Sequence, residues 1–190
     1  MEARFRLVSS IIQLNQSYYI ISDRRNHCIR VVKVTTFPDG NKKWTTSTYA
    51  GKCTSKGSKG GNRLEARFSF CTGMIKKDAN LYFINNPNKI MQLNMHTDIV
   101  TTVHNSSHWF NDLVLAPGKG GFYVTVYYGI LHIKEGTKTQ LLSKFSSALF
   151  NYPWGLKWLD NITLLVADYN THSIKVLDFK TKQVQQICSG

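Results

Sequence analysis

Four stretches of the chain share one arrangement of apolar and polar positions. Each begins with a phenylalanine and continues through a short apolar run, a polar or glycine-rich turn and a second apolar run, and then a third run that often alternates. Short runs of this kind, bounded by turn residues and rich in β-branched and aromatic side chains, predict β-strands rather than helices. The four stretches are residues 5–32, 68–94, 110–135 and 150–178. The pattern therefore predicts an all-β protein built from repeated units.

The starting phenylalanines give the repeat its period. Phe68 follows Phe5 by 63 residues, and Phe110 and Phe150 follow at intervals of 42 and 40. The tetrapeptide Glu-Ala-Arg-Phe stands at both of the first two starts, at 2–5 and at 65–68. A period of about 40–45 residues with several strands per unit is typical of a β-propeller blade. A single twisted sheet cannot bury both faces alone, so each phenylalanine is expected to be a wedge between stacked blades. The predicted repeats, within one domain of residues 1–190, are about 5–63, 64–106, 107–146 and 147–190.

Two turns resemble a known repeat. "SDRRNHCIRVV" (22–32) and "ADYNTHSIKVLD" (167–178) are similar to the core of the NHL repeat, in which Asp, two residues, Asn-His and one residue precede Ile or Val. The second turn has Thr171 in place of Asn, and the second repeat has Asn85 in place of Asp. The resemblance implies an NHL-type β-propeller in which these turn residues are structural. The matching residues are Asp23, Asn26, His27 and Ile29 in the first turn and Asp168, His172 and Ile174 in the second.

Propellers of the NHL family usually close with six blades, and four repeats fall short of that number. We therefore expect about four blades of four-stranded antiparallel sheets that are part of a larger, six-bladed propeller, so that the chain is truncated. The alternatives are a ring closed by four blades and an assembly with another copy, because unpaired edge strands favour self-association. No apolar leader follows Met1, and no run approaches the about 20 apolar residues of a membrane-spanning helix.

The charge balance narrows the choice of partner. The chain has 24 Lys and Arg against 11 Asp and Glu, a formal net charge of +13, which favours acidic partners such as an acidic protein, RNA or an anionic glycan. Basic residues gather at one blade turn and in the glycine-rich stretch 51–63, although a solvated loop is the simpler interpretation of that stretch. The candidate binding residues are Arg24, Arg25, Arg30, Lys52, Lys56 and Lys59.

Four cysteines, Cys28, Cys53, Cys71 and Cys188, show no C-x-x-C spacing, which disfavours a zinc site. Cys53 and Cys71 flank the glycine-rich loop, so we expect a disulfide between them; the alternative is four reduced thiols. The stretch "YAGKCTSKGSKGGNRLEARF" (49–68) resembles the connector between blades of many animal NHL proteins, and with the disulfide it favours an extracellular over a cytoplasmic location.

Signals for catalysis are weak. The sequence contains no G-x-S-x-G elbow, Walker loop or dinucleotide-binding fingerprint. The strand and turn around Asn111 and Asp112 resemble the metal-binding strand of calcium-dependent lactonase propellers, and His104 and His108 lack a third ligand. We therefore expect a non-enzymatic module that binds a protein and needs no cofactor. The alternatives are an RNA-binding propeller and a divergent metal-dependent lactonase or lyase.

Overall fold

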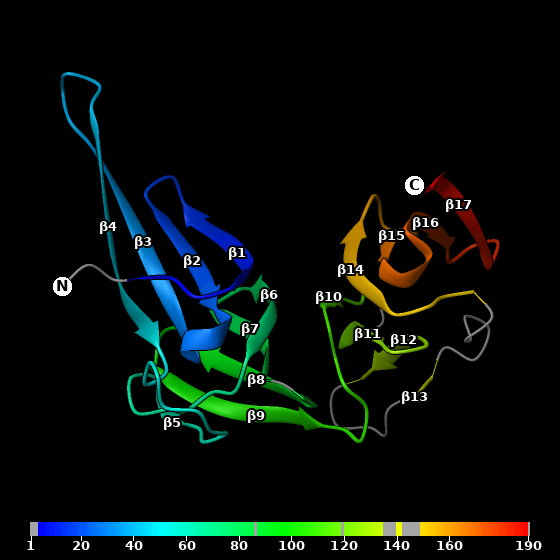
Figure 1. Cartoon of the computed structure of the whole chain (residues 1–190), viewed down its shortest axis with the longest axis horizontal. Coiled ribbons are helices and arrows are strands. Elements are labelled where there is room, and N and C mark those ends of the chain that lie inside the picture. The colour runs from blue at the N-terminus through cyan, green and yellow to red at the C-terminus, as the bar shows by residue number, and fades with distance from the viewer. Residues whose placement is uncertain (1–3, 86, 119, 135–139, 142–148, 190) are drawn as a thin grey trace. The chain divides into compact units, whose positions relative to one another are not determined.

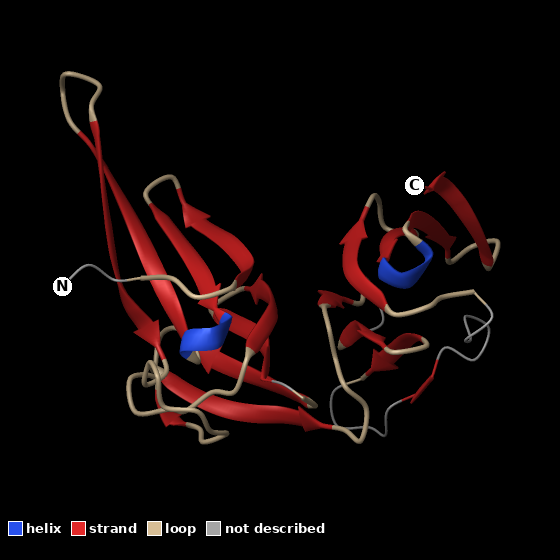
Figure 2. Ribbon diagram, viewed as in Figure 1, coloured by secondary structure: helices blue, strands red, loops and turns tan. Residues whose placement is uncertain are grey.

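The protein folds into four antiparallel β-sheets that form propeller blades (Figures 1 and 2). The computed structural model describes residues 4–85, 87–118, 120–134, 140–141 and 149–189. The chain divides into two compact units, Met1–Asn105 and Ser106–Gly190, each with two blades. The all-β architecture predicted from the sequence is confirmed. Within these described ranges, neither short helix has the length and apolar character needed to cross a membrane.

Blade 1 contains four strands in the order β1-β2-β3-β4. A one-turn 3-10 helix, η1 (Arg24–Asn26), joins the second strand to the third, and His27 closes it in the left-handed conformation with φ of 59°. The strands are β1 (Val8–Asn15), β2 (Tyr18–Asp23), β3 (Cys28–Thr36) and β4 (Lys42–Ala50).

Blade 2 has five strands instead of the four expected, in the order β5-β9-β8-β7-β6. The extra strand, β5, comes from the glycine-rich connector and pairs with the outermost strand, where Gly61 lies opposite Val100. A β-carbon on the neighbouring Gly60 would lie 2.5 Å from the Val100 carbonyl oxygen, so only glycine permits this approach. The strands are β5 (Gly61–Asn62), β6 (Cys71–Lys77), β7 (Asn80–Asn85), β8 (Lys89–Asn94) and β9 (Ile99–Asn105).

The second unit contains blades 3 and 4, each of four strands in sequential order. A second 3-10 helix, η2 (Tyr169–Thr171), precedes His172, which also adopts the left-handed conformation, with φ of 48°. The two NHL-like turns therefore have the same backbone path. Blade 3 comprises β10 (Leu113–Leu115), β11 (Phe122–Val126), β12 (Gly129–Ile133) and β13 (Gln140–Leu141), and blade 4 comprises β14 (Pro153–Trp158), β15 (Thr163–Asp168), β16 (Ser173–Asp178) and β17 (Gln183–Ser189).

Three of the four starting phenylalanines are buried. Phe68 is fully buried, and Phe110 and Phe150 are each 1% exposed. The Phe68 ring lies against Gly51 at the end of blade 1 and 4.9 Å from the Phe83 ring of blade 2, so it is the expected wedge. Phe5, the fourth, is 40% exposed. Glu2 and Ala3, which complete the first copy of the tetrapeptide, lie outside the described residues.

The repeated turn residue fixes the entry to its own blade. Asp23 accepts a hydrogen bond from the backbone N–H of Arg6 (2.7 Å), and Asp168 accepts one from Asn151 (2.9 Å). Asn85 performs the same task for Ser69, so the substitution in the second repeat preserves the contact. In each case the donor is the residue that follows the starting phenylalanine. A buried side-chain acceptor for this N–H explains why the position repeats.

The predicted Cys53–Cys71 disulfide is wrong. Cys53 pairs with Cys28, whose Cα lies 4.9 Å away, and Cys71 is a buried free thiol in the core shared by blades 1 and 2. Burial also raises the pKa of the Cys71 thiol. The reason lies in strand register: β4 returns alongside β3 and places Ala50 opposite Ile29, so the chain passes Cys28 three residues later.

Candidate functional site

Two predicted basic residues meet over one aromatic ring in the first unit. The Arg24 guanidinium carbon lies 5.8 Å from the Phe70 ring centroid, and Lys56 Nζ lies 5.2 Å from it. Arg24 comes from the turn of blade 1, Lys56 from the connector and Phe70 from the entry to blade 2. Both distances are within the range of cation–π attraction. We call Arg24, His27, Lys56 and Phe70 the Phe70 cluster.

His27 contacts the Phe70 ring and its backbone. The two ring centroids are 5.0 Å apart in an edge-to-face arrangement, and His27 Nδ1 accepts a hydrogen bond from the Phe70 N–H at 3.4 Å. Partial burial, with the positive charges of Lys56 and Arg6, lowers the pKa of His27. The imidazole is therefore neutral at pH 7, as an acceptor must be, and the charge of the cluster comes from Arg24 and Lys56.

The connector that provides Lys56 is tied to its surroundings. Besides the Cys28–Cys53 disulfide, the Thr54 N–H bonds to the Asn26 carbonyl (2.7 Å) and the Gly57 N–H to the Phe68 carbonyl (2.9 Å). Asn85 Nδ2 and Lys89 Nζ both donate to Ser58 Oγ, at 3.1 and 2.9 Å. The stretch 51–63 is thus an anchored platform with exposed lysines rather than the free solvated loop that composition favoured.

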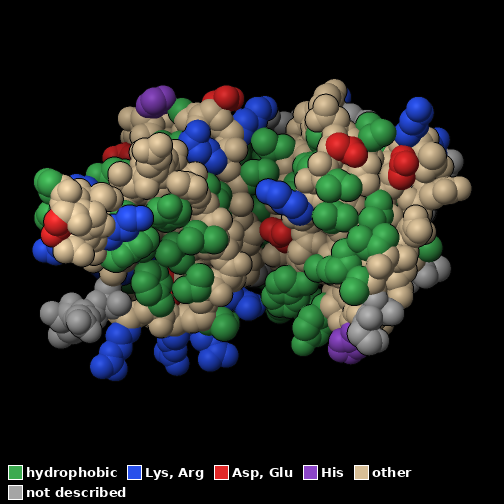
Figure 3. All heavy atoms as spheres, turned by 90° about the horizontal axis from the view of Figure 1, so that it is seen from above, with side chains coloured by type: hydrophobic (Ala, Val, Ile, Leu, Met, Phe, Trp, Pro, Cys, Tyr) green, Lys and Arg blue, Asp and Glu red, His purple; other side chains and the backbone are tan. Residues whose placement is uncertain are grey.

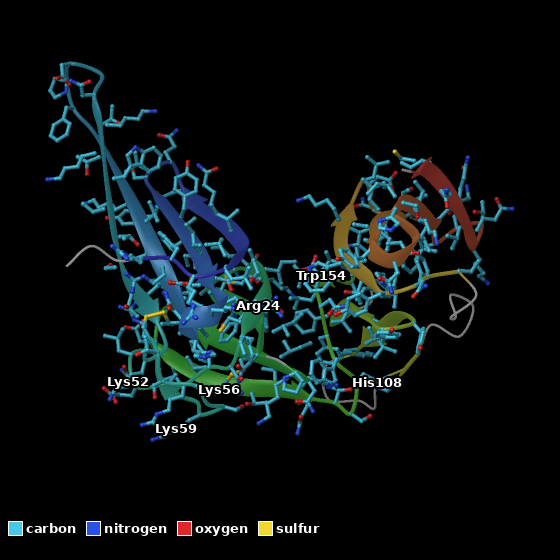
Figure 4. The ribbon with its side chains drawn as sticks, viewed as in Figure 1. Arg24, Lys52, Lys56, Lys59, His108 and Trp154 are labelled. Carbon is cyan, nitrogen blue, oxygen red and sulfur yellow. A yellow bond between two sulfur atoms is a disulfide. The ribbon has the colours of Figure 1, made fainter. Side chains whose placement is uncertain are left out.

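The other predicted basic residues divide into two groups. Arg25, Lys52 and Lys59 are exposed, and Figure 4 shows the two lysines on the same connector as Lys56. Arg30 instead turns inward, because its guanidinium donates to Thr48 Oγ1 (3.0 Å) and contacts Cys53 Sγ (3.4 Å). Figure 3 shows lysine and arginine side chains projecting from the first unit.

The side chains of Asn111 and Asp112 both form hydrogen bonds with backbone groups of blade 4. Asn111 Nδ2 donates to the Pro153 carbonyl (3.0 Å), and an Asp112 carboxylate oxygen accepts the Leu156 N–H (2.9 Å). Burial raises the pKa of Asp112 to about 6. His108 Nδ1 lies 3.3 Å from Ser106 Oγ. Across the described ranges, no three His, Cys, Asp or Glu side chains gather closely enough to hold a metal ion.

The aromatic residues that gather in each unit were not predicted from the sequence. Phe70 lies two residues after Phe68 and has positive φ (53°), as Leu7 does after Phe5 (60°) and Tyr152 after Phe150 (60°). This offset is the signal that could have identified Phe70. A second aromatic group surrounds Tyr152 in the second unit, where rings lie 4.3–6.0 Å apart; its members are Tyr127, Tyr128, Tyr152, Trp154 and Tyr169.

Known proteins resemble this chain in structure. No family model and no curated protein sequence matches it. The propeller of a nidogen/laminin complex superposes with a TM-score of 0.64 and 14% identity over 92% of this chain and 60% of that one. The WD40 β-propeller domain of Doa1 superposes with a TM-score of 0.61 and 13% identity, over 96% of this chain and 68% of that domain's chain. Virginiamycin B lyase from Staphylococcus aureus superposes with a TM-score of 0.56 and 12% identity, over 95% of this chain and 55% of the lyase chain. The chain thus spans about half to two thirds of these structures, and the likeness shows that its fold is that of a β-propeller.

Proposed function

We propose that this chain is an NHL-type propeller module that binds an acidic segment of another protein through the Phe70 cluster and performs no catalysis. The observation that carries the proposal is that Arg24, Lys56 and Phe70 come together from three different parts of the chain. Each cation already lies within cation–π range of the same ring, which favours a geometry in which both face one partner and lowers the loss of side-chain freedom on binding. The surrounding Arg25, Lys52 and Lys59 extend the positive surface.

An acidic protein segment fits this surface better than RNA does. Single-stranded RNA is bound by open aromatic faces on which bases stack. The Phe70 ring is already approached by both cations and by the edge of His27. Carboxylates need no open ring, because Arg24 and Lys56 can each donate charge-assisted hydrogen bonds to them.

Two further observations support an interaction module outside the cytosol. The nidogen/laminin propeller, which this chain resembles in fold, is part of a complex with another protein. The Cys28–Cys53 disulfide closes the base of the connector, and structural disulfides persist mainly in oxidising compartments. These observations favour a secreted or ectodomain propeller.

The test is a binding titration with defined probes. Fluorescence anisotropy compares a labelled glutamate-rich peptide with labelled oligouridine, using wild type and the double variant Arg24→Glu/Lys56→Glu. We expect the peptide affinity to fall at least about tenfold in the double variant, since each replaced cation becomes a repelling charge. Affinity should also fall as salt is added, because exposed charges are screened.

The matched control is Lys42→Glu/Lys43→Glu. These two exposed lysines lie on β4, and their replacement changes the net charge of the same unit by the same amount. Equal losses in both double variants would mean that only overall charge matters, and the Phe70 cluster would then have no special role. Tight binding of oligouridine, without peptide binding, would replace the proposal by the RNA alternative.

A further inference from the structure

Blade 4 carries an open hollow next to its NHL-like turn. The hollow measures about 430 Å³, and its lining includes Ala167, His172, Ser173, Ile174 and Cys188. The exposed surface of this lining is largely apolar, and Trp154, Asp168 and Tyr169 complete it. We call this hollow the blade-4 socket. All of its lining residues belong to blade 4.

Strand register shows which part of blade 1 corresponds to the socket. Ile174 pairs with Cys188 in blade 4 as Ile29 pairs with Ala50 in blade 1. Ser173, opposite Asp168, likewise corresponds to Cys28, opposite Asp23. The structure therefore contains the same surface twice.

In blade 1 this surface is covered from within the chain. Phe68 lies against Gly51, Phe70 lies against His27, and the Cys71 carbonyl accepts hydrogen bonds from the hydroxyls of Ser9 and Ser22. As a result Ile29 and Ala50 are fully buried. Their counterparts in the socket are open: Ile174 is 37% exposed and Cys188 is exposed. The socket thus corresponds to the surface of blade 1 that residues 68–71 cover, but its own residues are exposed.

The chain also displays an uncovered entry segment. Phe5, Leu7 and Val8 occupy the positions of Phe68, Phe70 and Cys71, and they are 40%, 51% and 49% exposed. The two segments share positive φ at the same position, 60° at Leu7 and 53° at Phe70. Each is also anchored at the residue after its phenylalanine by a turn side chain, Asp23 or Asn85. Residues 5–8, the entry segment, are therefore already shaped to cover a blade.

We propose that the entry segment of one copy docks in the blade-4 socket of a second copy. The contact repeats an interface already present in the chain, in which residues 68–71 cover blade 1. It is heterologous, so it can close into a ring or extend into a linear assembly. Ala167 stands where Ser22 bonds to the Cys71 carbonyl, and the new contact lacks that hydrogen bond. Association should therefore be weaker than the internal interface, and reversible.

Charge gives this contact a distinctive salt dependence. Each copy has a formal net charge of +13, so two copies repel one another at low ionic strength. Added salt screens that repulsion and strengthens apolar association. Binding of an acidic peptide to the Phe70 cluster should respond in the opposite direction. Failure of one proposal can thus be distinguished from failure of the other.

The test uses two complementary variants in sedimentation velocity at high salt. Phe5→Glu places a charge in the entry segment and leaves the socket unchanged. Ile174→Glu places a charge in the socket and leaves the entry segment unchanged. Both positions are partly exposed, so each variant should fold. We expect wild type to associate as its concentration rises, and each variant alone to associate at least about 100-fold more weakly. An equimolar mixture of the two should form a one-to-one dimer, because one intact pair of surfaces remains.

Ile162→Glu is the matched control, since Ile162 is 46% exposed on blade 4 and does not line the socket. It should associate as wild type does. Alkylation of Cys188 supplies a second readout, because the corresponding Ala50 is fully buried and Cys188 should become protected on association. A wild type that stays monomeric at every concentration overturns the proposal. A mixture of the two variants that forms no dimer overturns it as well.

Discussion

The two units solve the same packing problem with different chemistry. In the first unit, Ser10 lies opposite Ser22 in blade 1, and the Ser10 hydroxyl accepts the Met74 N–H of blade 2 at 3.3 Å. In the second unit, Asp112 lies beside Thr125, and its carboxylate accepts the Leu156 N–H of blade 4. Met74 and Leu156 each lie six residues after their starting phenylalanine. In both units, one side-chain acceptor near the start of one blade thus bonds to a backbone N–H in a strand of the next blade.

The difference between the units lies in what else secures each blade. Blade 1 has the Cys28–Cys53 disulfide, and Asp23 there is bonded by the neutral Asn26 amide at 2.8 Å. In blade 4, Asp168 forms an ion pair with Lys175 at 2.5 Å. Lys175 also lies 5.6 Å from the Phe150 ring centroid. The comparison shows that register and burial fix the position of a contact, while the chemical group that makes it can vary.

The largest expected effect concerns the feature that both units share. Phe68→Ala and Phe150→Ala should each lower the free energy of unfolding of their own unit by about 4 kcal/mol, because both rings are buried between packed strands. Hydrogen exchange resolved by unit measures the two effects separately. Phe5→Ala is the control: its ring is 40% exposed, and the loss should stay below about 1 kcal/mol. Equal losses for Phe5 and Phe68 would contradict the wedge assignment.

The next effect should be confined to the first unit. Cys28→Ser/Cys53→Ser opens a loop with a sequence separation of 25, which corresponds to about 3.5 kcal/mol in the chain-entropy model. The connector should then lose protection from hydrogen exchange, and the second unit should be unchanged. Cys188→Ser provides a comparison in which an exposed free thiol is removed. A loss of protection that extends to both units would show that the disulfide stabilises more than blade 1.

Much of the architecture could be predicted because it depends on local patterns. The spacing of Phe68, Phe110 and Phe150 and the repeated turn around Asp23 and Asp168 predicted blades, and the structure contains them. The repetition of the turn residues predicted a structural role for them; Asp23 and Asp168 each accept a hydrogen bond from the start of their own blade.

Contacts that depend on strand register could not be predicted. The partner of Cys53 was missed because Cys28 and Cys53 are brought together only by the pairing of β3 with β4. The inward turn of Arg30 was missed for the same reason, since Thr48 lies directly opposite it in that pairing. Phe70 was overlooked because the two cations that approach its ring come from distant parts of the sequence.

The smallest of the three effects should be confined to the second unit and should depend on pH. Burial raises the folded pKa of Asp112 to about 6, above its ordinary value of 3.8. A raised carboxyl pKa contributes stability that is present below pH 4 and lost as pH rises through 6. The shift corresponds to at most about 3 kcal/mol between pH 4 and pH 7. Asp112→Asn retains an oxygen acceptor for the Leu156 N–H and removes the ionisation, so this variant should lose that part of the pH dependence.

The measurement is the urea midpoint of the second unit at pH 4.5 and at pH 7, in wild type and in Asp112→Asn. The difference between the two proteins isolates the contribution of Asp112 from those of other groups in the same unit that titrate between these pH values. At pH 7 the variant should be the more stable protein, because it buries no charge at this position. Repeating the pH 7 titration with calcium tests the lactonase-like alternative. If calcium stabilises wild type and this stabilisation disappears in Asp112→Asn, then Asp112 is a metal ligand. The second unit would in that case differ from the first in function and not only in the chemistry of one contact between blades.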